Sequence, residues 1–169
     1  PDAVSRKIME TDFWGHATLS SKILPFMVKT GGGTIVVMSS LSGLFGFPQR
    51  SMYCAAKHAL HGFFDSLRSE VAGAGVGVTM VCPSFIRTGI GSAATDGSGA
   101  PVSGPRVTTG GESTPEEIAQ RILDAVASGK DLLLPDATSR KAWWLSRLAP
   151  GLYARVMKRR VGGEFPGLS

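Results

Sequence analysis

The sequence predicts an α/β fold in which a parallel sheet carries helices on both faces. Segments with helical apolar spacing alternate with short β-branched runs, in the order helix, strand, helix, strand, helix, strand. The run over residues 34–39 lacks polar alternation, which indicates a strand covered on both faces, as in a parallel sheet. The 169 residues, of which 43% are hydrophobic and 18% charged, are enough for one domain with a substantial core.

Composition limits the kinds of protein that the chain can be. No apolar run reaches the roughly 20 residues that a membrane-spanning helix needs, and no signal peptide is recognisable. Cys54 and Cys82 lack the spacing of metal ligands, so we expect no metal site and two buried free thiols in a reducing compartment, the cytoplasm. The chain begins with Pro1 and becomes helical at once, and three strands are few for this architecture, so we expect further sheet upstream.

The first helix is expected over residues 3–28. Its apolar residues recur at broadly helical spacing, with an irregularity predicted at Gly15, and the KTGGG sequence at 29–33 ends it. The strand at 34–39 follows. A second helix is expected over residues 51–72, with an apolar face suited to packing on a sheet or on another helix.

Glycines surround the start of the second predicted strand, residues 76–82. Glycines that cradle a dinucleotide follow a strand and open a helix, whereas Gly73, Gly75 and Gly77 follow a helix and open a strand. We therefore interpret them as a helix-to-strand turn. Pro83 ends the strand.

The second half of the chain contains one expected loop and three expected helices. Residues 91–111 are almost wholly Gly, Ser, Ala, Thr, Pro and Val, which predicts a flexible lid. Thr114, Pro115 and Glu117 predict a helix start with a capping box, and that helix is expected to end at Gly129. A short third strand at 131–135 and amphipathic helices at 138–148 and 152–161 are expected to follow.

Three polar residues are expected to converge at the carboxyl end of the first strand. Ser40 follows that strand, and Tyr53 lies thirteen residues later, near the start of a helix. Lys57 is four residues beyond Tyr53, so both share one helical face. An ammonium group beside a phenol lowers the pKa of the tyrosine, and a serine hydroxyl can hydrogen-bond a substrate oxygen as its charge changes. These groups suit hydride transfer between a carbinol carbon and a nicotinamide, with the tyrosine carrying the proton.

A Tyr-x-x-x-Lys spacing alone also fits an exposed pair of residues on a helix. Further motifs accompany Ser40, Tyr53 and Lys57, however. The strand with Ser40, the YCAAK sequence that starts at Tyr53, and the interval between the two residues resemble the C-terminal part of the short-chain dehydrogenase/reductases. Residues 83–88, PSFIRT, resemble that family's Pro-Gly-x-x-x-Thr segment, with Ser84 at the usual glycine. The resemblance is close over residues 9–135 and loose beyond them.

This resemblance implies a Rossmann-like, doubly wound parallel sheet in three α/β/α layers, of which the chain supplies the C-terminal part. It implies an NAD(P)-dependent alcohol dehydrogenase or carbonyl reductase in which Ser40 polarises the substrate oxygen and Tyr53 is the general acid/base. Lys57 lowers the pKa of the tyrosine and binds the nicotinamide ribose. The backbone of residue 86 contacts the nicotinamide amide. The implied cofactor-binding residues are Tyr53, Lys57, Pro83, Ile86 and Thr88.

Two departures from the family leave a second interpretation open. The family's glycine-rich turn, with its selector for NAD against NADP, is absent from these residues, and Asp12 stands where the family carries a catalytic asparagine. An ionised aspartate only accepts hydrogen bonds, so it either positions a relay water beside Lys57 or leaves the relay weakened. The second interpretation is a catalytically silent binding or interaction protein that keeps the fold.

The three histidines offer no rival active site. His16 lies on the first expected helix, while His58 and His61 follow Lys57 on the second. None has a Ser or Asp partner placed for a triad, so structural or solvent-facing roles are expected.

The remaining features predict partners. The resemblance implies a homodimer or homotetramer through the first two helices. Residues 136–169 read as a basic, amphipathic helical extension of a catalytic domain at 1–135, and this extension either lines the substrate entrance or touches an anionic membrane. Nucleic acid is not expected, because no recognition motif accompanies the net charge of +5. The expected substrate is a small, hydrophobic alcohol or ketone.

Overall fold

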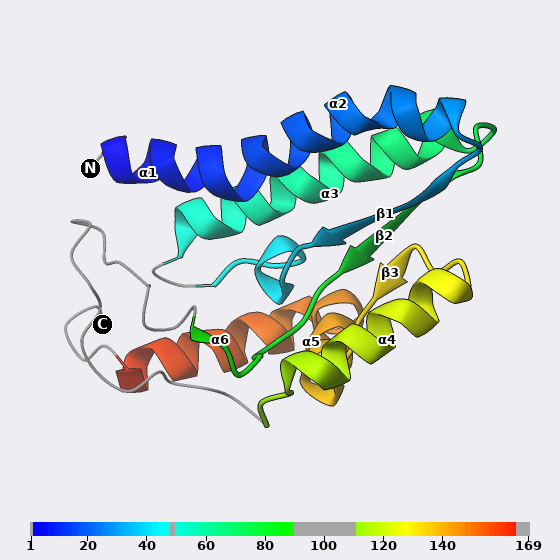
Figure 1. Ribbon diagram of the computed structural model, residues 1–169. Coiled ribbons are helices and arrows are strands. Elements are labelled where there is room, and N and C mark those ends of the chain that lie inside the picture. Colours follow the sequence, from blue (N-terminus) through cyan, green and yellow to red (C-terminus); the bar gives the residue numbers. More distant parts are fainter. Residues whose placement is uncertain (1, 48–49, 90–110, 165–169) are drawn as a thin grey trace.

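The computed structural model describes residues 2–47, 50–89 and 111–164, with side chains as far as Arg159. Three layers make up the molecule (Figure 1). On one side of the central sheet lie helices α1 (Asp2–Met9), α2 (Gly15–Lys29) and α3 (Ser51–Val71). On the other side lie α4 (Pro115–Ala127), α5 (Ala137–Leu148) and α6 (Pro150–Glu164).

The sheet consists of β1 (Gly33–Met38), β2 (Val76–Val81) and β3 (Leu132–Leu133), all parallel and in that order. This confirms the predicted α/β class and the predicted parallel sheet. The third strand is shorter than the expected 131–135. Its last ladder bond runs from the Cys82 N–H to the Leu133 carbonyl, and Pro135 has no N–H with which to continue.

A π-helical turn, η1 (Glu10–Trp14), separates α1 from α2, and the Gly15 N–H bonds back to the Glu10 carbonyl. The irregularity predicted at Gly15 therefore lies in the five residues before it. Such turns accommodate one extra residue per turn, are rare in proteins and are frequently found at functional sites. Asp12 is at the centre of this turn.

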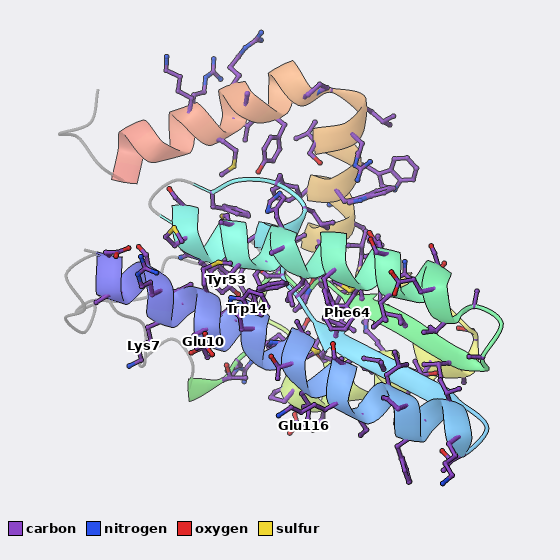
Figure 2. All side chains as sticks on the ribbon, turned by 90° about the horizontal axis from the view of Figure 1, so that it is seen from above. Lys7, Glu10, Trp14, Tyr53, Phe64 and Glu116 are labelled. Carbon is purple, nitrogen blue, oxygen red and sulfur yellow. The ribbon has the colours of Figure 1, made fainter. Side chains whose placement is uncertain are left out.

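The core lies between α3 and the sheet. Phe64 and Leu60 are fully buried, in agreement with the predicted apolar face of the second helix (Figure 2). Burying each such side chain contributes about 1.5–3 kcal/mol. Phe13 of η1 meets Phe63 edge to face, with ring centroids 6.1 Å apart, so the first helical stretch is held against α3. The buried cluster comprises Val37, Leu60, Phe64, Leu67, Val71, Val76, Val78 and Met80.

The prediction that the first strand is covered on both faces is wrong for β1. Val37 faces the core and is 1% exposed, whereas Val36 and Met38 on the opposite face are each 37% exposed. Within the described residues β1 is an edge strand, so nothing pairs with its outer side. In this sheet β2 is the strand that is buried on both faces.

Two glycine turns approach each other where β1 and β2 begin. Gly32 has φ +111°, and a Cβ added there would lie 2.0 Å from the Gly75 carbonyl oxygen. The Gly33 N–H donates to that same carbonyl at 3.1 Å. The glycines around residue 75 therefore form the expected helix-to-strand turn and no dinucleotide loop.

Helix α4, on the far side of the sheet, begins as the sequence predicts. The Thr114 hydroxyl accepts the Glu117 N–H at 3.2 Å and the Glu117 carboxylate accepts the Thr114 N–H at 3.0 Å, which confirms the capping box of α4. Gly129, with φ +62°, follows its end. Helix α6 starts at Pro150, two residues earlier than expected. The predicted lid at 91–111 falls outside the described residues except for Gly111. None of the helices that the structure describes is long and apolar enough to cross a membrane.

Candidate active site

Ser40 is fixed where β1 meets a short 3₁₀ turn, η2 (Leu41–Gly43). Its backbone is extended, and its hydroxyl oxygen accepts the Ser42 N–H at 3.2 Å as the cap of that turn. The next residue, Leu41, donates its N–H to the Pro83 carbonyl at 3.2 Å. This bond joins the loop after β1 to the loop after β2, so Ser40 lies beside the segment that begins at Pro83.

Tyr53 lies in the first turn of α3, where α3 runs alongside η1 (Figure 2). Burial raises the pKa of its phenol, and a hydrogen bond with the Ser40 side chain lowers the pKa in part. The nearby Asp12 carboxylate adds a smaller upward effect. The net direction is opposite to the lowered pKa that the sequence predicts, so that expectation is wrong for the chain without a bound ligand.

The Lys57 ammonium is held between two oxygen atoms. Its Nζ lies 3.2 Å from the Met38 carbonyl oxygen and 3.3 Å from Oδ1 of Asp12, and its side chain is 7% exposed. It also lies 5.6 Å from the centroid of the Tyr53 ring. The cation is therefore engaged by a carbonyl and a carboxylate while it packs against the ring. Burial is the main influence on the pKa of the Tyr53 phenol.

Four predicted site residues thus come together from three elements. Asp12 comes from η1, Ser40 from the end of β1, and Tyr53 and Lys57 from consecutive turns of α3. In chemical terms, a hydroxyl touches a phenol that has a cation under its ring, and a carboxylate holds that cation. This arrangement can polarise an oxygen atom at the two hydroxyls and move a proton there.

The segment predicted to bind the nicotinamide is anchored by a residue that the sequence analysis missed. The Ser84 N–H and hydroxyl donate to the two carboxylate oxygens of Asp136, at 3.0 and 2.7 Å. Asp136 also caps α5 by accepting the Ser139 N–H at 2.7 Å. The serine at the family's usual glycine position therefore has a defined partner. The only sequence signal for Asp136 was its place as a possible cap residue before a helix. It lies 52 positions after Ser84.

Ile86 forms an isolated parallel bridge with Ser113. The two bonds of this bridge use the Phe85 carbonyl and the Arg87 N–H rather than the polar groups of Ile86 itself. Thr88 is exposed. Among the described residues no hydrogen bond joins Ile86 or Thr88 to the group around Tyr53, so their predicted cofactor contacts stay predictions.

His61 has a structural role, as expected, and it contacts a serine that the sequence analysis did not identify. Its Nε2 lies 3.2 Å from the Ser39 hydroxyl and 3.5 Å from the Cys82 sulfur. Burial lowers the pKa of His61 and raises the pKa of the Cys82 thiol to about 12. This contact ties α3 to the ends of β1 and β2 directly behind Ser40. One sequence signal could have indicated that His61 points towards the site. It lies one helical turn beyond Lys57 and so shares that residue's face of the helix.

Both cysteines are free and buried, as predicted. In the part of the chain that the structure describes, no group of three or more His, Cys, Asp or Glu side chains is arranged to hold a metal ion.

Comparison with known proteins assigns the chain to a family. A family model described as short chain dehydrogenase matches residues 1–98, which is more than half of the chain. The chain belongs to the short-chain dehydrogenase family. The match includes the four converging residues and the segment at 83–88.

Curated relatives agree with this assignment. The chain is 38% identical over 159 residues to a dehydrogenase/reductase SDR family protein 7-like of Drosophila melanogaster, covering 94% of this chain and 49% of that protein. It is 38% identical over 162 residues to dehydrogenase/reductase SDR family member 7B of Mus musculus, covering 95% and 50%. The chain therefore spans about half the length of the curated relatives it matches.

Solved structures of this family share the fold. A short chain dehydrogenase of Burkholderia cenocepacia, crystallised with NADP, superposes with a TM-score of 0.75 at 21% identity and covers 92% of this chain and 60% of its own. A short-chain dehydrogenase of Streptomyces avermitilis gives 0.72 at 25% identity, with coverage of 94% and 61%. A Burkholderia phymatum member crystallised with NAD gives 0.70 at 21% identity, with coverage of 85% and 57%. The predicted Rossmann-like fold is thereby confirmed.

Proposed function

We propose that the whole protein is an NAD(P)-dependent oxidoreductase of the short-chain type that interconverts an alcohol and a carbonyl compound. The observation that carries this proposal is the convergence of Ser40, Tyr53 and Lys57, with the Lys57 ammonium 5.6 Å from the centroid of the Tyr53 ring and the Ser40 side chain near enough to lower the pKa of the phenol in part. NADP and NAD bound to the Burkholderia proteins support the choice of cofactor.

The residues present fit the nicotinamide end of such a cofactor. The buried Lys57 cation lies at the base of the site, where it can bind ribose hydroxyls beside Tyr53. The bridge at Ile86 leaves that residue's own N–H and carbonyl outside its two hydrogen bonds, so they can pair with a carboxamide. We assign Pro83 and Thr88 to the same nicotinamide end of the cofactor site. When bound, the nicotinamide ring would supply or accept the hydride.

The chain's own residues perform the proton chemistry. In the reducing direction the Tyr53 hydroxyl donates its proton to the substrate oxygen, and in the oxidising direction the phenolate accepts it. The Ser40 hydroxyl hydrogen-bonds the same oxygen as its charge changes. We assign to Lys57, the buried cation that packs against the tyrosine ring, the binding of the nicotinamide ribose.

Asp12 is the observation that favours a second candidate, a catalytically silent binding protein with this fold. Its carboxylate holds the Lys57 ammonium, and it cannot donate the hydrogen bond that an asparagine offers. The two candidates differ in turnover. The full-length protein should oxidise NADH or NADPH, read as loss of absorbance, with hydrophobic ketones as substrates. Saturable cofactor binding without turnover of any ketone or alcohol would favour the silent protein.

We further propose a homodimer or homotetramer in the cytoplasm that acts on a small, hydrophobic alcohol or ketone. Helix α2 presents Leu19, Ile23 and Phe26, which are 66%, 45% and 65% exposed. Such a contiguous apolar face supports a subunit contact. The free, buried Cys54 and Cys82 support a reducing compartment.

A further inference from the structure

Three large apolar side chains of the α5–α6 hairpin are exposed. Trp144 is 55% exposed, Leu148 is 74% exposed and Leu152 is 48% exposed. Trp144 and Leu148 are four residues apart on α5 and therefore share a face, and Leu152 follows in the first turn of α6. Adjoining apolar side chains of this size mark a binding surface, whereas single exposed ones need no explanation.

The same hairpin is strongly basic. Residues 137–159 contain six basic residues and no acidic one. Within the described part of the chain none of the six forms an ion pair with a carboxylate. In Figure 2 the side chains of α6 that end in nitrogen point away from the rest of the molecule. The exposed cations are Arg140, Lys141, Arg147, Arg155, Lys158 and Arg159.

The charged and apolar groups are interleaved on one face. On α5 the exposed positions 140, 141, 144, 147 and 148 follow helical spacing. A shallow hollow, open to solvent, is lined by Arg140 and Lys141 together with the apolar Trp144, Leu145 and Leu148. Phosphate groups would pair with such cations while acyl chains cover the apolar side chains.

We propose that the α5–α6 hairpin docks on an anionic lipid bilayer. Cations beside exposed Trp and Leu side chains are the composition of segments that lie in a membrane interface. Charge complementarity selects the lipid, because the cytoplasmic leaflet carries a negative surface potential. The hairpin lies in the membrane surface and does not cross the bilayer.

The hairpin is held to the body of the protein independently of this surface. Asp136 joins the start of α5 to Ser84, and the Tyr153 ring of α6 lies 4.9 Å from the Phe45 ring, in the loop that follows Ser40. The exposed face can therefore be altered without removing these anchors. Membrane docking at this position would bring the loop that carries Ser40 close to the bilayer.

Vesicle flotation of the full-length protein tests the charge requirement. Vesicles of phosphatidylcholine with one-third phosphatidylserine should carry the protein, whereas pure phosphatidylcholine should not, and 1 M salt should release it. The triple variant Arg140→Gln, Lys141→Gln, Arg147→Gln should lower the partition coefficient by roughly a hundredfold or more. Its matched control, Lys7→Gln, Lys22→Gln, Lys130→Gln, makes the same charge change at exposed positions elsewhere and should leave it within a few-fold.

Fluorescence quenching tests the apolar requirement at the proposed surface. Brominated lipid should quench the tryptophan emission of the wild-type protein in anionic vesicles. Trp144→Phe should remove most of this quenching, whereas Trp14→Phe, at a residue that is 52% exposed on η1, should not. Leu148→Ser with Leu152→Ser should weaken binding, and Leu123→Ser, at a residue that is 63% exposed on α4, should not.

Three results would overturn the proposal. The first is equal binding to neutral and anionic vesicles, and the second is quenching that survives Trp144→Phe. The third is a Leu148→Ser, Leu152→Ser variant that loses a subunit contact in sedimentation while it binds anionic vesicles normally. That result would assign the surface to a second copy of the chain.

Discussion

The Lys57 ammonium lies 3.3 Å from the Asp12 carboxylate, in a site where the family usually carries an asparagine in place of the aspartate. The aspartate sits in a π-helical turn, and the lysine is 5% exposed beneath the tyrosine. An ion pair at this position holds the lysine in place. It also puts a negative charge near the Tyr53 phenol, where it raises the pKa of that phenol.

Replacing Asp12 by Asn or Ala separates its charge from its hydrogen bonding. Both variants remove the carboxylate that raises the pKa of Tyr53, so that pKa should fall in both. The acidic limb of the pH profile for alcohol oxidation should then move to lower pH, because phenolate forms earlier. Turnover should be kept or raised in Asp12→Asn, which can still hold a water, and lowered in Asp12→Ala. Identical kcat–pH profiles for all three proteins would show that the residue is a bystander.

Gly43 allows η2 to approach α3 behind the site. A Cβ added there would lie 2.6 Å from the Ser39 hydroxyl, 2.8 Å from the Lys57 carbonyl oxygen and 2.9 Å from the His61 ring. Gly43→Ala should therefore destabilise the protein by about 1–3 kcal/mol and lower turnover, because η2 positions Ser40. The matched control is Gly46→Ala, where an added Cβ meets nothing within 4 Å. Equal urea midpoints for the two variants would refute the close approach.

His61 should give stability a pH dependence. Burial lowers its pKa below 6.5, so near pH 6 the folded state binds fewer protons than the unfolded state. Its contribution is complete above pH 6.5 and is lost as the pH falls through the folded-state pKa. The melting temperature of the full-length protein should therefore drop less between pH 7 and pH 5 in His61→Gln than in the wild type. His16 and His58 remain in both proteins. If the melting temperature drops by the same amount in both, His61 is excluded as the source of this pH dependence.

Local sequence signals predicted the elements of the fold well. The capping box at Thr114 and the glycine end of the same helix depend only on neighbouring residues, so they were recognisable. The spacing of Tyr53 and Lys57 predicted a shared helical face for the same reason. The contacts that the sequence did not predict join distant parts of the chain. Ser84 bonds to Asp136, 52 residues away, and His61 contacts Ser39, 22 residues away.

The exposure of β1 and the raised pKa of Tyr53 were also beyond local reasoning. A β-branched run indicates that a strand can be buried, but neighbouring strands and helices decide whether it is. Likewise, the spacing of Tyr53 and Lys57 shows that the cation is near. It does not show that Asp12 and the Met38 carbonyl engage that cation. In both cases the deciding atoms come from other elements of the fold.

The described residues supply only the nicotinamide side of the proposed cofactor site. Residues 1–169 expressed alone should therefore bind NADH or NADPH negligibly, because a doubly wound sheet binds its dinucleotide across strands of both halves. They should also be poorly soluble, since the edge of β1 is apolar and unpaired. Fluorescence titration of the isolated chain with NADH is the measurement, and full-length protein is the control. Saturable micromolar binding by the isolated chain would contradict the half-site account.

Turnover of Tyr53→Phe tests the central claim most directly. The substitution removes the proton-transferring hydroxyl and little volume, so the full-length variant should keep its melting temperature. Its kcat should fall by roughly 10²–10⁴-fold, the usual contribution of general acid/base catalysis. Tyr153→Phe, at the only other tyrosine of the chain, is the matched control and should keep kcat within a few-fold. Near-normal kcat in Tyr53→Phe would contradict the assignment of Tyr53 as the acid/base and with it the proposed mechanism.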